Sequence, residues 1–377
     1  MCGTEGAMLC PSEEEERMRW SVVAIGVWMC GVAWAQDAEG DDGQIKVEGA
    51  SSESAAVDDA APEPPSPPEP AELFDAVVLR LRSGDYQGAN LLIEQLGAME
   101  LSDVESTELA YQRANLAALK LDYSSAKDQY EAIAQSPEHE HRRLDARFRA
   151  AELRGVLGDR VAAVEEMTEI LETEVLDDSG LAKVALCRAI FMMEGERWKK
   201  GKRAFEAALG LPGTAAETYY QAKAWYTLTS SELDELDEVR LRKRKRRLRK
   251  ALSTRIGGLQ GADEALRITV ELSEPEWILA GLMRLSASWE RLGDDILAAP
   301  EPRLTDDQLL LYRQGVNEQV VGFWLRGVRY LDGGINVVER LGYETPRLQE
   351  AREHRGRLGM KVEMAPTSGE AGAAGRP

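Results

Sequence analysis

The stretch KLDYSSAKDQYEAI, residues 120–133, decides the fold, because altered versions of it recur along the 377-residue chain at a nearly constant interval. The related stretches are SGDYQGANLLIEQL at 83–96, LGDRVAAVEEMTEI at 157–170 and GERWKKGKRAFEAAL at 195–209. Their alignment brings four residues to one equivalent position, spaced 37, 37 and 38 residues apart: Tyr86, Tyr123, Arg160 and Trp198. A period of this length predicts an array of repeated units.

The aligned stretches also share a pattern of side-chain size. Three residues after the aligned position stands a small residue: Ala89, Ala126, Ala163 and Gly201. Four residues further on stands a larger one: Ile93, Tyr130, Met167 and Phe205. Nine residues before the aligned position stand Val77, Ala114, Ala151 and Ala189.

Over residues 71–210 this pattern resembles the tetratricopeptide repeat (TPR), a helix–turn–helix unit of 34 residues. The resemblance implies that the small residues let the two helices of a unit approach closely, while the larger residue fills the gap to the next unit. The longer period implies connecting loops that are longer by about three residues. We therefore expect an all-α fold, a TPR-like superhelical array of antiparallel helix pairs with a C-terminal helical extension or bundle.

Residues 211–360 keep amphipathic helical patterns, but the repeat fades. They predict a fifth helical pair with a longer second helix, then two more long amphipathic helices and a last helix. The stretch 232–256 is expected to form one long helix, docked through three leucines: Leu241, Leu248 and Leu252. Whether this region continues the superhelix or packs as a capping bundle is left open by the sequence.

The amino terminus has the layout of a secretory signal peptide. An Arg-containing start at Met18 leads into an apolar run and then Ala33-Trp34-Ala35, a small-x-small cleavage site. Residues 1–35 are therefore expected to be removed, with Met18 as the true start. An uncleaved anchor is the alternative, although the apolar run is shorter than the ~20 residues of a spanning helix.

The segments that flank the helical region have the composition of disordered chain. Residues 36–70 hold ten acidic side chains and one lysine, with six prolines at positions 62–70, so we expect a disordered acidic and Pro-rich linker. Residues 361–377 are expected to form a disordered tail. Cys187 is the only cysteine after position 35, so no internal disulfide is expected.

The sequence contains no arrangement of residues typical of catalysis, and we expect no enzyme, no cofactor and no metal site. His139 and His141 stand beside acidic residues, but side chains two positions apart point to different faces of a helix. No G-x-S-x-G, H-E-x-x-H or Cys–His pairing is found. The many carboxylates are scattered over solvated helical faces.

In a TPR array the first helices of the units line a groove that binds peptide segments through a few anchors. The register places six residues there: Tyr111, Asn115, Phe148, Glu152, Ile190 and Met193. The alternative for each is packing against the next repeat. We expect a scaffold for protein–protein interactions in a bacterial envelope (periplasmic) complex, similar in layout to repeat proteins of motility or transport machinery. The alternatives are an accessory subunit of an envelope enzyme and a cytoplasmic nucleic-acid-binding repeat protein.

A basic strip interrupts this acidic chain, whose formal net charge is −20. Nine of eleven consecutive side chains in it are basic: Arg240, Arg242, Lys243, Arg244, Lys245, Arg246, Arg247, Arg249 and Lys250. An exposed strip of this kind attracts anionic lipid, an acidic protein or the chain's own acidic linker, and the alternative is an ordinary solvated helix face. Nucleic acid is not expected as a partner of an acidic, exported protein.

Overall fold

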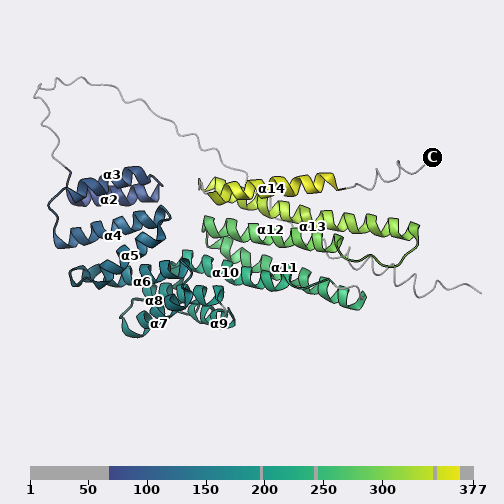
Figure 1. Cartoon of the computed structure of the whole chain (residues 1–377), viewed down its shortest axis with the longest axis horizontal. Helices are drawn as coiled ribbons and strands as arrows, with labels where there is room; N and C mark the ends of the chain where they lie inside the picture. Colours follow the sequence, from purple (N-terminus) through teal and green to yellow (C-terminus); the bar gives the residue numbers. More distant parts are fainter. Residues whose placement is uncertain (1–67, 196–197, 242–244, 343–345, 366–377) are drawn as a thin grey trace, which may run out of the picture. The chain divides into compact units, whose positions relative to one another are not determined.

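The computed structural model describes residues 68–195, 198–241, 245–342 and 346–365. Within these ranges the chain is all-α, with thirteen α-helices, α2 to α14, two short 3-10 helices and no strand (Figure 1). None of the helices in the described ranges is long and apolar enough to cross a membrane. The expected signal peptide, nearly all of the expected linker and residues 366–377 lie outside these ranges.

The first eight helices form four consecutive antiparallel pairs, in which each helix packs against the next one along the chain (Figure 1). The predicted all-α fold of helix pairs is confirmed. In all four pairs the second helix begins at the aligned position found in the sequence. The pairs are α2 (Pro70–Arg82) with α3 (Tyr86–Gly97), α4 (Asp103–Leu119) with α5 (Tyr123–Gln135), α6 (Glu140–Val156) with α7 (Arg160–Thr173), and α8 (Asp178–Glu194) with α9 (Trp198–Ala208).

The turn inside a pair explains why the second helix begins where it does. In the first three pairs an Asp stands immediately before the second helix and its carboxylate accepts a hydrogen bond from a backbone N–H in the first turn. Asp85 accepts from the N–H of Gly88 at 2.8 Å, Asp122 from that of Ser125 at 3.2 Å, and Asp159 from that of Ala162 at 3.1 Å. An N-cap of this kind stabilises a helix by about 1 kcal/mol.

The spacing of small and large residues that recurs in each unit sets the distance between the two helices of a pair. Ala89, Ala126 and Ala163 are fully buried, and Gly201 is buried as well. A Cβ at Gly201 would lie 2.5 Å from the backbone nitrogen of Met193 on the preceding helix. The small residue is therefore required by close helix packing, as the sequence predicts.

One turn differs from the others in a way that can be tested. The residue before the Asp cap has positive φ in three pairs, and it is Gly84, Leu121 and Gly158 in turn. A left-handed conformation costs a non-glycine residue about 1–2 kcal/mol. The Leu121 side chain is exposed, so that little packing energy offsets this cost.

We expect Leu121→Gly to raise the free energy of unfolding by about 0.5–1 kcal/mol, because glycine adopts this backbone conformation without strain. Thermal unfolding followed by circular dichroism measures the change. The matched control is Ser124→Gly, inside α5, which should lower stability by a similar amount. A loss of stability with Leu121→Gly would show that this turn is not strained.

Five longer helices follow: α10 (Thr218–Asp237), α11 (Lys245–Glu271), α12 (Pro275–Leu297), α13 (Asp306–Arg340) and α14 (Pro346–Met364). The first helices of successive pairs also contact one another in chain order, from α2 through α4, α6, α8 and α10 to α12, which in turn contacts α14. These contacts continue past residue 210 without a break. The region that the sequence left open therefore extends the layer of first helices.

The prediction of one helix over residues 232–256 is wrong. α10 ends at Asp237 and α11 begins at Lys245, and the two helices pack against each other. Leu233 and Leu259 are buried in the same core cluster, whereas a continuous helix would hold them about 39 Å apart. Of the three leucines expected to dock the helix, Leu252 packs against this cluster, while Leu241 and Leu248 are half-buried.

The boundary of the expected tail also needs correction. α14 continues to Met364, so the first four residues of the stretch 361–377 are helical. Val362 packs against the core shared with α13, and the Lys361 ammonium lies 2.6 Å from Glu290 and 2.8 Å from Asp294 of α12. These contacts anchor the end of α14.

Candidate functional site

Five of the six residues expected to line a groove are buried, which corrects their predicted role as exposed anchors. The buried ones are Tyr111, Phe148, Glu152, Ile190 and Met193, and Asn115 is half-buried. Phe148 is only 2% exposed and packs edge-to-face on Tyr220, with ring centroids 5.9 Å apart. Phe148 packs toward the first helices that follow it, whereas Tyr111 packs on Tyr130 of α5 and Met193 lies against Gly201 of α9.

Charged side chains cover the buried aromatic rings. The guanidinium carbon of Arg142 lies 4.7 Å from the centre of the Tyr111 ring, and the ammonium of Lys183 lies 4.6 Å from the centre of the Phe148 ring. Cations at these distances are attracted to the face of an aromatic ring. We use the name inner face for the half-exposed layer formed by Glu108, Arg142, Asp145, Arg149 and Lys183.

Ion pairs across neighbouring helices fix the charges of the inner face. Arg142 on α6 donates through Nε to Glu108 on α4 at 2.8 Å, and Lys183 on α8 donates to Asp145 on α6 at 3.2 Å. The Tyr111 hydroxyl also donates to Asp145. Burial acts to raise the pKa of Asp145, but Lys183 and the Tyr111 hydroxyl outweigh it, so the pKa lies below its usual range. Asp145 is therefore charged at neutral pH.

Arg149 is the centre of a second group, which joins α6 to α10. Its Nη1 donates to Glu152 at 2.8 Å and to the hydroxyl of Tyr220 at 3.1 Å, and that hydroxyl donates to Glu152 at 3.2 Å. Burial acts to lower the pKa of Arg149, but Tyr220 and Glu152 hold it well above the ordinary value. The side chain remains 37% exposed, and its Nε has no hydrogen-bond partner among the described atoms. Nε is itself buried, so it is closed to an acceptor from solvent.

The sequence contained a signal for the inner face that the interpretation missed. One position of the first helix carries a charged residue in four successive units, at intervals of 37, 38 and 40 residues: Glu108, Asp145, Lys183 and Lys223. Glu108, Asp145 and Lys183 at this position are half-buried and still reach solvent, whereas Lys223 is buried. The prediction assigned the groove to the neighbouring aromatic residues Tyr111 and Phe148 instead.

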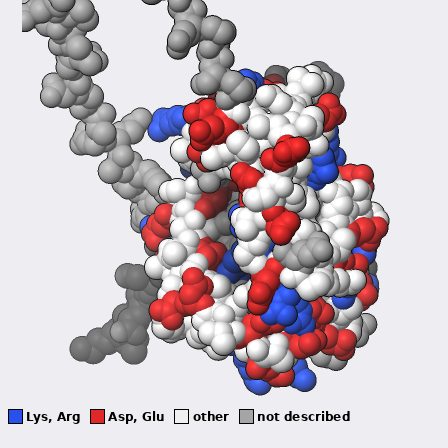
Figure 2. Space-filling model, turned by 90° about the vertical axis from the view of Figure 1, so that its left-hand side faces the viewer, with Lys and Arg blue, Asp and Glu red and all other residues white. Residues whose placement is uncertain are grey.

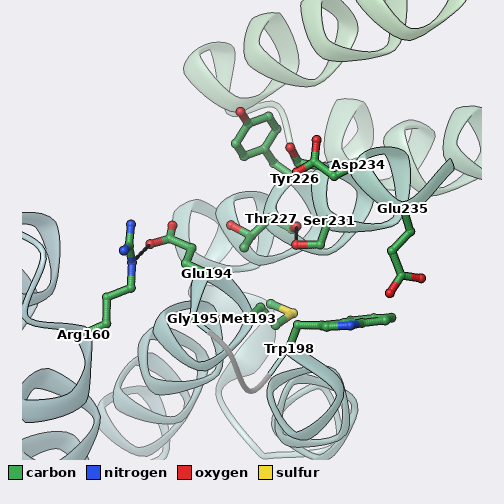
Figure 3. A pocket seen from close by; sticks show the side chains of 11 residues that line it. Arg160, Met193, Glu194, Gly195, Trp198, Tyr226, Thr227, Ser231, Asp234 and Glu235 are labelled. Carbon is green, nitrogen blue, oxygen red and sulfur yellow. Dashed lines mark hydrogen bonds and ion pairs between the residues drawn. The ribbon is translucent and has the colours of Figure 1, made fainter. Parts of the chain in front are cut away.

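An open pocket of about 450 Å³ lies where the turn between α8 and α9 meets α10 (Figure 3). Its lining comes from the end of α8, the start of α9 and the middle and end of α10, with Arg160 of α7. Figure 3 shows the Glu235 carboxylate directed toward the indole ring of Trp198. Met193 is the one predicted groove residue that lines this pocket.

The lining of the pocket favours positive over neutral or negative groups. Among the described residues of the lining, Glu194, Asp234 and Glu235 contribute carboxylates and Arg160 contributes a cationic side chain. Arg160 lies 3.3 Å from Glu194, which neutralises that pair. An aromatic ring beside a carboxylate suits a cationic side chain.

The histidines and the cysteine occupy ordinary structural positions. Nδ1 of His139 lies 2.5 Å from the hydroxyl of Thr107, and His141 is exposed on the first turn of α6. Cys187 is fully buried, which raises the pKa of its thiol well above the usual value. Among the residues that the structure describes, no group of three or more His, Cys, Asp or Glu side chains is placed to hold a metal ion.

The basic strip falls on the connection between α10 and α11 and on the first turns of α11. Arg240 is exposed on the connection, and Arg246, Arg247, Arg249 and Lys250 are exposed on α11. Lys245 is the first residue of α11, and Arg242, Lys243 and Arg244 lie outside the described residues. Cations at the amino-terminal end of a helix oppose its dipole. The strip therefore does not stabilise the helix that carries it.

We expect replacement of Arg246, Arg247 and Lys250 with glutamine to leave the melting temperature within about 2 °C of wild type, since exposed charges contribute little to folding. The same change should weaken binding to vesicles that contain anionic lipid, measured by co-sedimentation at low and high salt. Equal binding by the variant and the wild type would leave the strip as a solvated surface.

The face on the left of Figure 1 carries charges of both signs. Figure 2 shows acidic side chains spread over this face, with basic side chains between them.

Comparison of the chain with models of known protein families gives no match, and comparison with curated proteins gives none either.

Proposed function

We propose that this chain is a non-enzymatic scaffold of the TPR type that binds segments of other proteins along its inner face. The observation that carries the proposal is the row of fixed charges on successive first helices, held in place over buried aromatic rings. Stacked helix pairs typically present such a continuous surface to an elongated ligand. The periodic small residues and the Asp-capped turns support the comparison with TPR units.

The chemistry of the inner face indicates what kind of segment would bind. Arg142, Arg149 and Lys183 offer cationic groups beside the carboxylates of Glu108 and Asp145. The Arg149 side chain is 37% exposed and can contribute a charged contact to a carboxylate of the ligand. A helical or extended segment with charges of both signs matches this row, and acidic groups on it would face the three cations.

We propose further that the scaffold acts in a bacterial envelope complex. The apolar run after Met18 and the Ala33-Trp34-Ala35 site support export, with Gln36 as the first residue of the mature chain. The acidic, Pro-rich stretch that follows would separate the folded helices from the membrane surface until the signal peptide is removed. Partners would then be other envelope proteins.

The test is affinity capture from the native host with the full chain as bait. Wild-type protein should capture a partner that the double variant Arg142→Gln/Lys183→Gln loses by about tenfold or more, because two charged contacts are removed. The matched control is Lys199→Gln/Lys200→Gln, two exposed cations on α9 rather than on the inner face. Amino-terminal sequencing of the same bait should give Gln36. Capture unaffected by the inner-face variant would exclude this surface, and an uncleaved cytosolic bait would exclude the envelope.

A further inference from the structure

α13 is much longer than the helices that pack against it. It has 35 residues, whereas α12 has 23 and α14 has 19. No side chain in its first 14 residues, 306–319, is fully buried, and the first buried one is Val320. The amino-terminal part of α13 therefore extends beyond its neighbours.

One face of α13 carries the same seam along both its covered and its uncovered parts. Side chains at alternating spacings of four and three residues pack in the core shared with α14: Trp324, Val328, Leu331, Ile335 and Val338. The same spacing continues backward through Val321, Asn317, Gln314 and Leu310. Such a repeat is typical of two helices packed along their length. The uncovered half thus has the pattern of a helix interface.

A mainly apolar pocket of about 440 Å³ lies where α14 ends against this seam. Val321 and Trp324 of α13 and Met360 and Met364 of α14 contribute to its lining, with Arg357 and Lys361 at the same site. Both methionines are exposed. The sequence after Ala365, PTSGEAGAAGRP, has no large apolar side chain that could fill the pocket.

We propose that the pocket and the uncovered half of α13 bind the same surface of a second copy of this chain, with the two α13 helices antiparallel. In this register Leu310 faces Val321 of the second copy, and Gln314 faces Asn317 of the second copy. This register is symmetric about a two-fold axis, so that each of these contacts occurs twice, as an interface between identical subunits requires. The two central amides can hydrogen-bond to each other, and a polar pair in such a seam fixes its register.

Charge complementarity favours a second copy over an unrelated helix. The antiparallel register brings Asp307, at the exposed start of α13, opposite Trp324 of the second copy. The ammonium of Lys361 lies 5.4 Å from the centre of the Trp324 ring, and Arg357 lines the same pocket. Lys361 is already paired with Glu290 and Asp294, whereas no ion pair of Arg357 is found among the described residues. Asp307 would therefore meet Arg357 of the second copy.

Sedimentation equilibrium of the full chain tests the proposal. Wild-type protein should be a dimer. Leu310→Asp should raise the dissociation constant of this dimer by at least about 100-fold, because each of the two subunits would bury one aspartate in the interface. The matched control is Leu311→Asp. Leu311 is the more exposed of the two, 68% against 52%, but it lies outside the seam, so that this variant should remain dimeric. A monomeric wild-type protein, or equal weakening by both variants, would overturn the proposal.

A charge exchange separates this register from other modes of self-association. Asp307→Lys and Arg357→Glu should each weaken the dimer by about tenfold, and the double variant should recover most of the loss. Failure of the double variant to recover would exclude the antiparallel register. Circular dichroism of each variant establishes that the helices remain folded, since all the substituted residues are exposed. These measurements do not depend on any partner of the inner face.

Discussion

Replacement of Asp237 with alanine is expected to lower the free energy of unfolding by about 3–5 kcal/mol, the cost of removing one partner from a buried ion pair. The Asp237 carboxylate is 5% exposed and accepts hydrogen bonds from Ser288 at 3.0 Å, Arg284 at 3.1 Å and Arg255 at 3.4 Å. These groups come from α11 and α12, so one carboxylate ties three helices together. Without it the Arg255 guanidinium, which is almost fully buried, retains only Asp295 as an anionic partner in the described region.

Chemical denaturation followed by circular dichroism measures this change. The matched control is Asp234→Ala, since Asp234 also pairs with Arg284, at 2.6 Å, but is 72% exposed. That variant should lose less than about 1 kcal/mol, the usual contribution of an exposed ion pair. Similar losses in the two variants would show that burial of Asp237 does not determine the contribution of this carboxylate.

Phe148→Ala is expected to destabilise the protein by about 3–5 kcal/mol, because it leaves a cavity among α6, α8 and α10. Phe148 packs on Tyr220 and lies in the largest buried cluster of the described residues. An exposed binding anchor would behave in the opposite way, with weaker partner binding and unchanged stability. Leu91→Ala, at an exposed position of α3, is the control and should change stability by less than about 0.5 kcal/mol. If Phe148→Ala unfolds at the same temperature as the wild type, the hypothesis that Phe148 is a binding anchor would be supported again.

The aligned position in the sequence coincides with the starts of the second helices because the information that fixes these starts is local. An Asp cap, a small residue and a larger one recur within nine residues around Tyr86, Tyr123 and Arg160. These residue types are required by the turn and by the distance between two neighbouring helices. Local requirements of this kind can be read from one sequence.

The inner face was harder to predict, because exposure depends on how closely successive first helices approach. Phe148 and Arg149 are adjacent in the chain, but one is buried and the other still reaches solvent. The break between α10 and α11 depends likewise on Asp237 and Arg255, which meet only after the chain has reversed. Helix propensity alone favours a continuous helix through such a stretch, since Lys, Arg and Leu are good helix formers.

The order of contacts along the chain has a consequence for how this protein acquires its structure during synthesis. Each helix from α2 to α9 packs chiefly against its neighbours in the sequence, so α2 and α3 can pair once residue 97 has emerged from the ribosome. Later pairs can add to a template that is already ordered, without waiting for distant segments. α13 is the last helix to gain its partner, because its core is complete only when α14 has been made. Truncation before Pro346 should therefore leave the early pairs native while exposing apolar surface that aggregates or recruits chaperones.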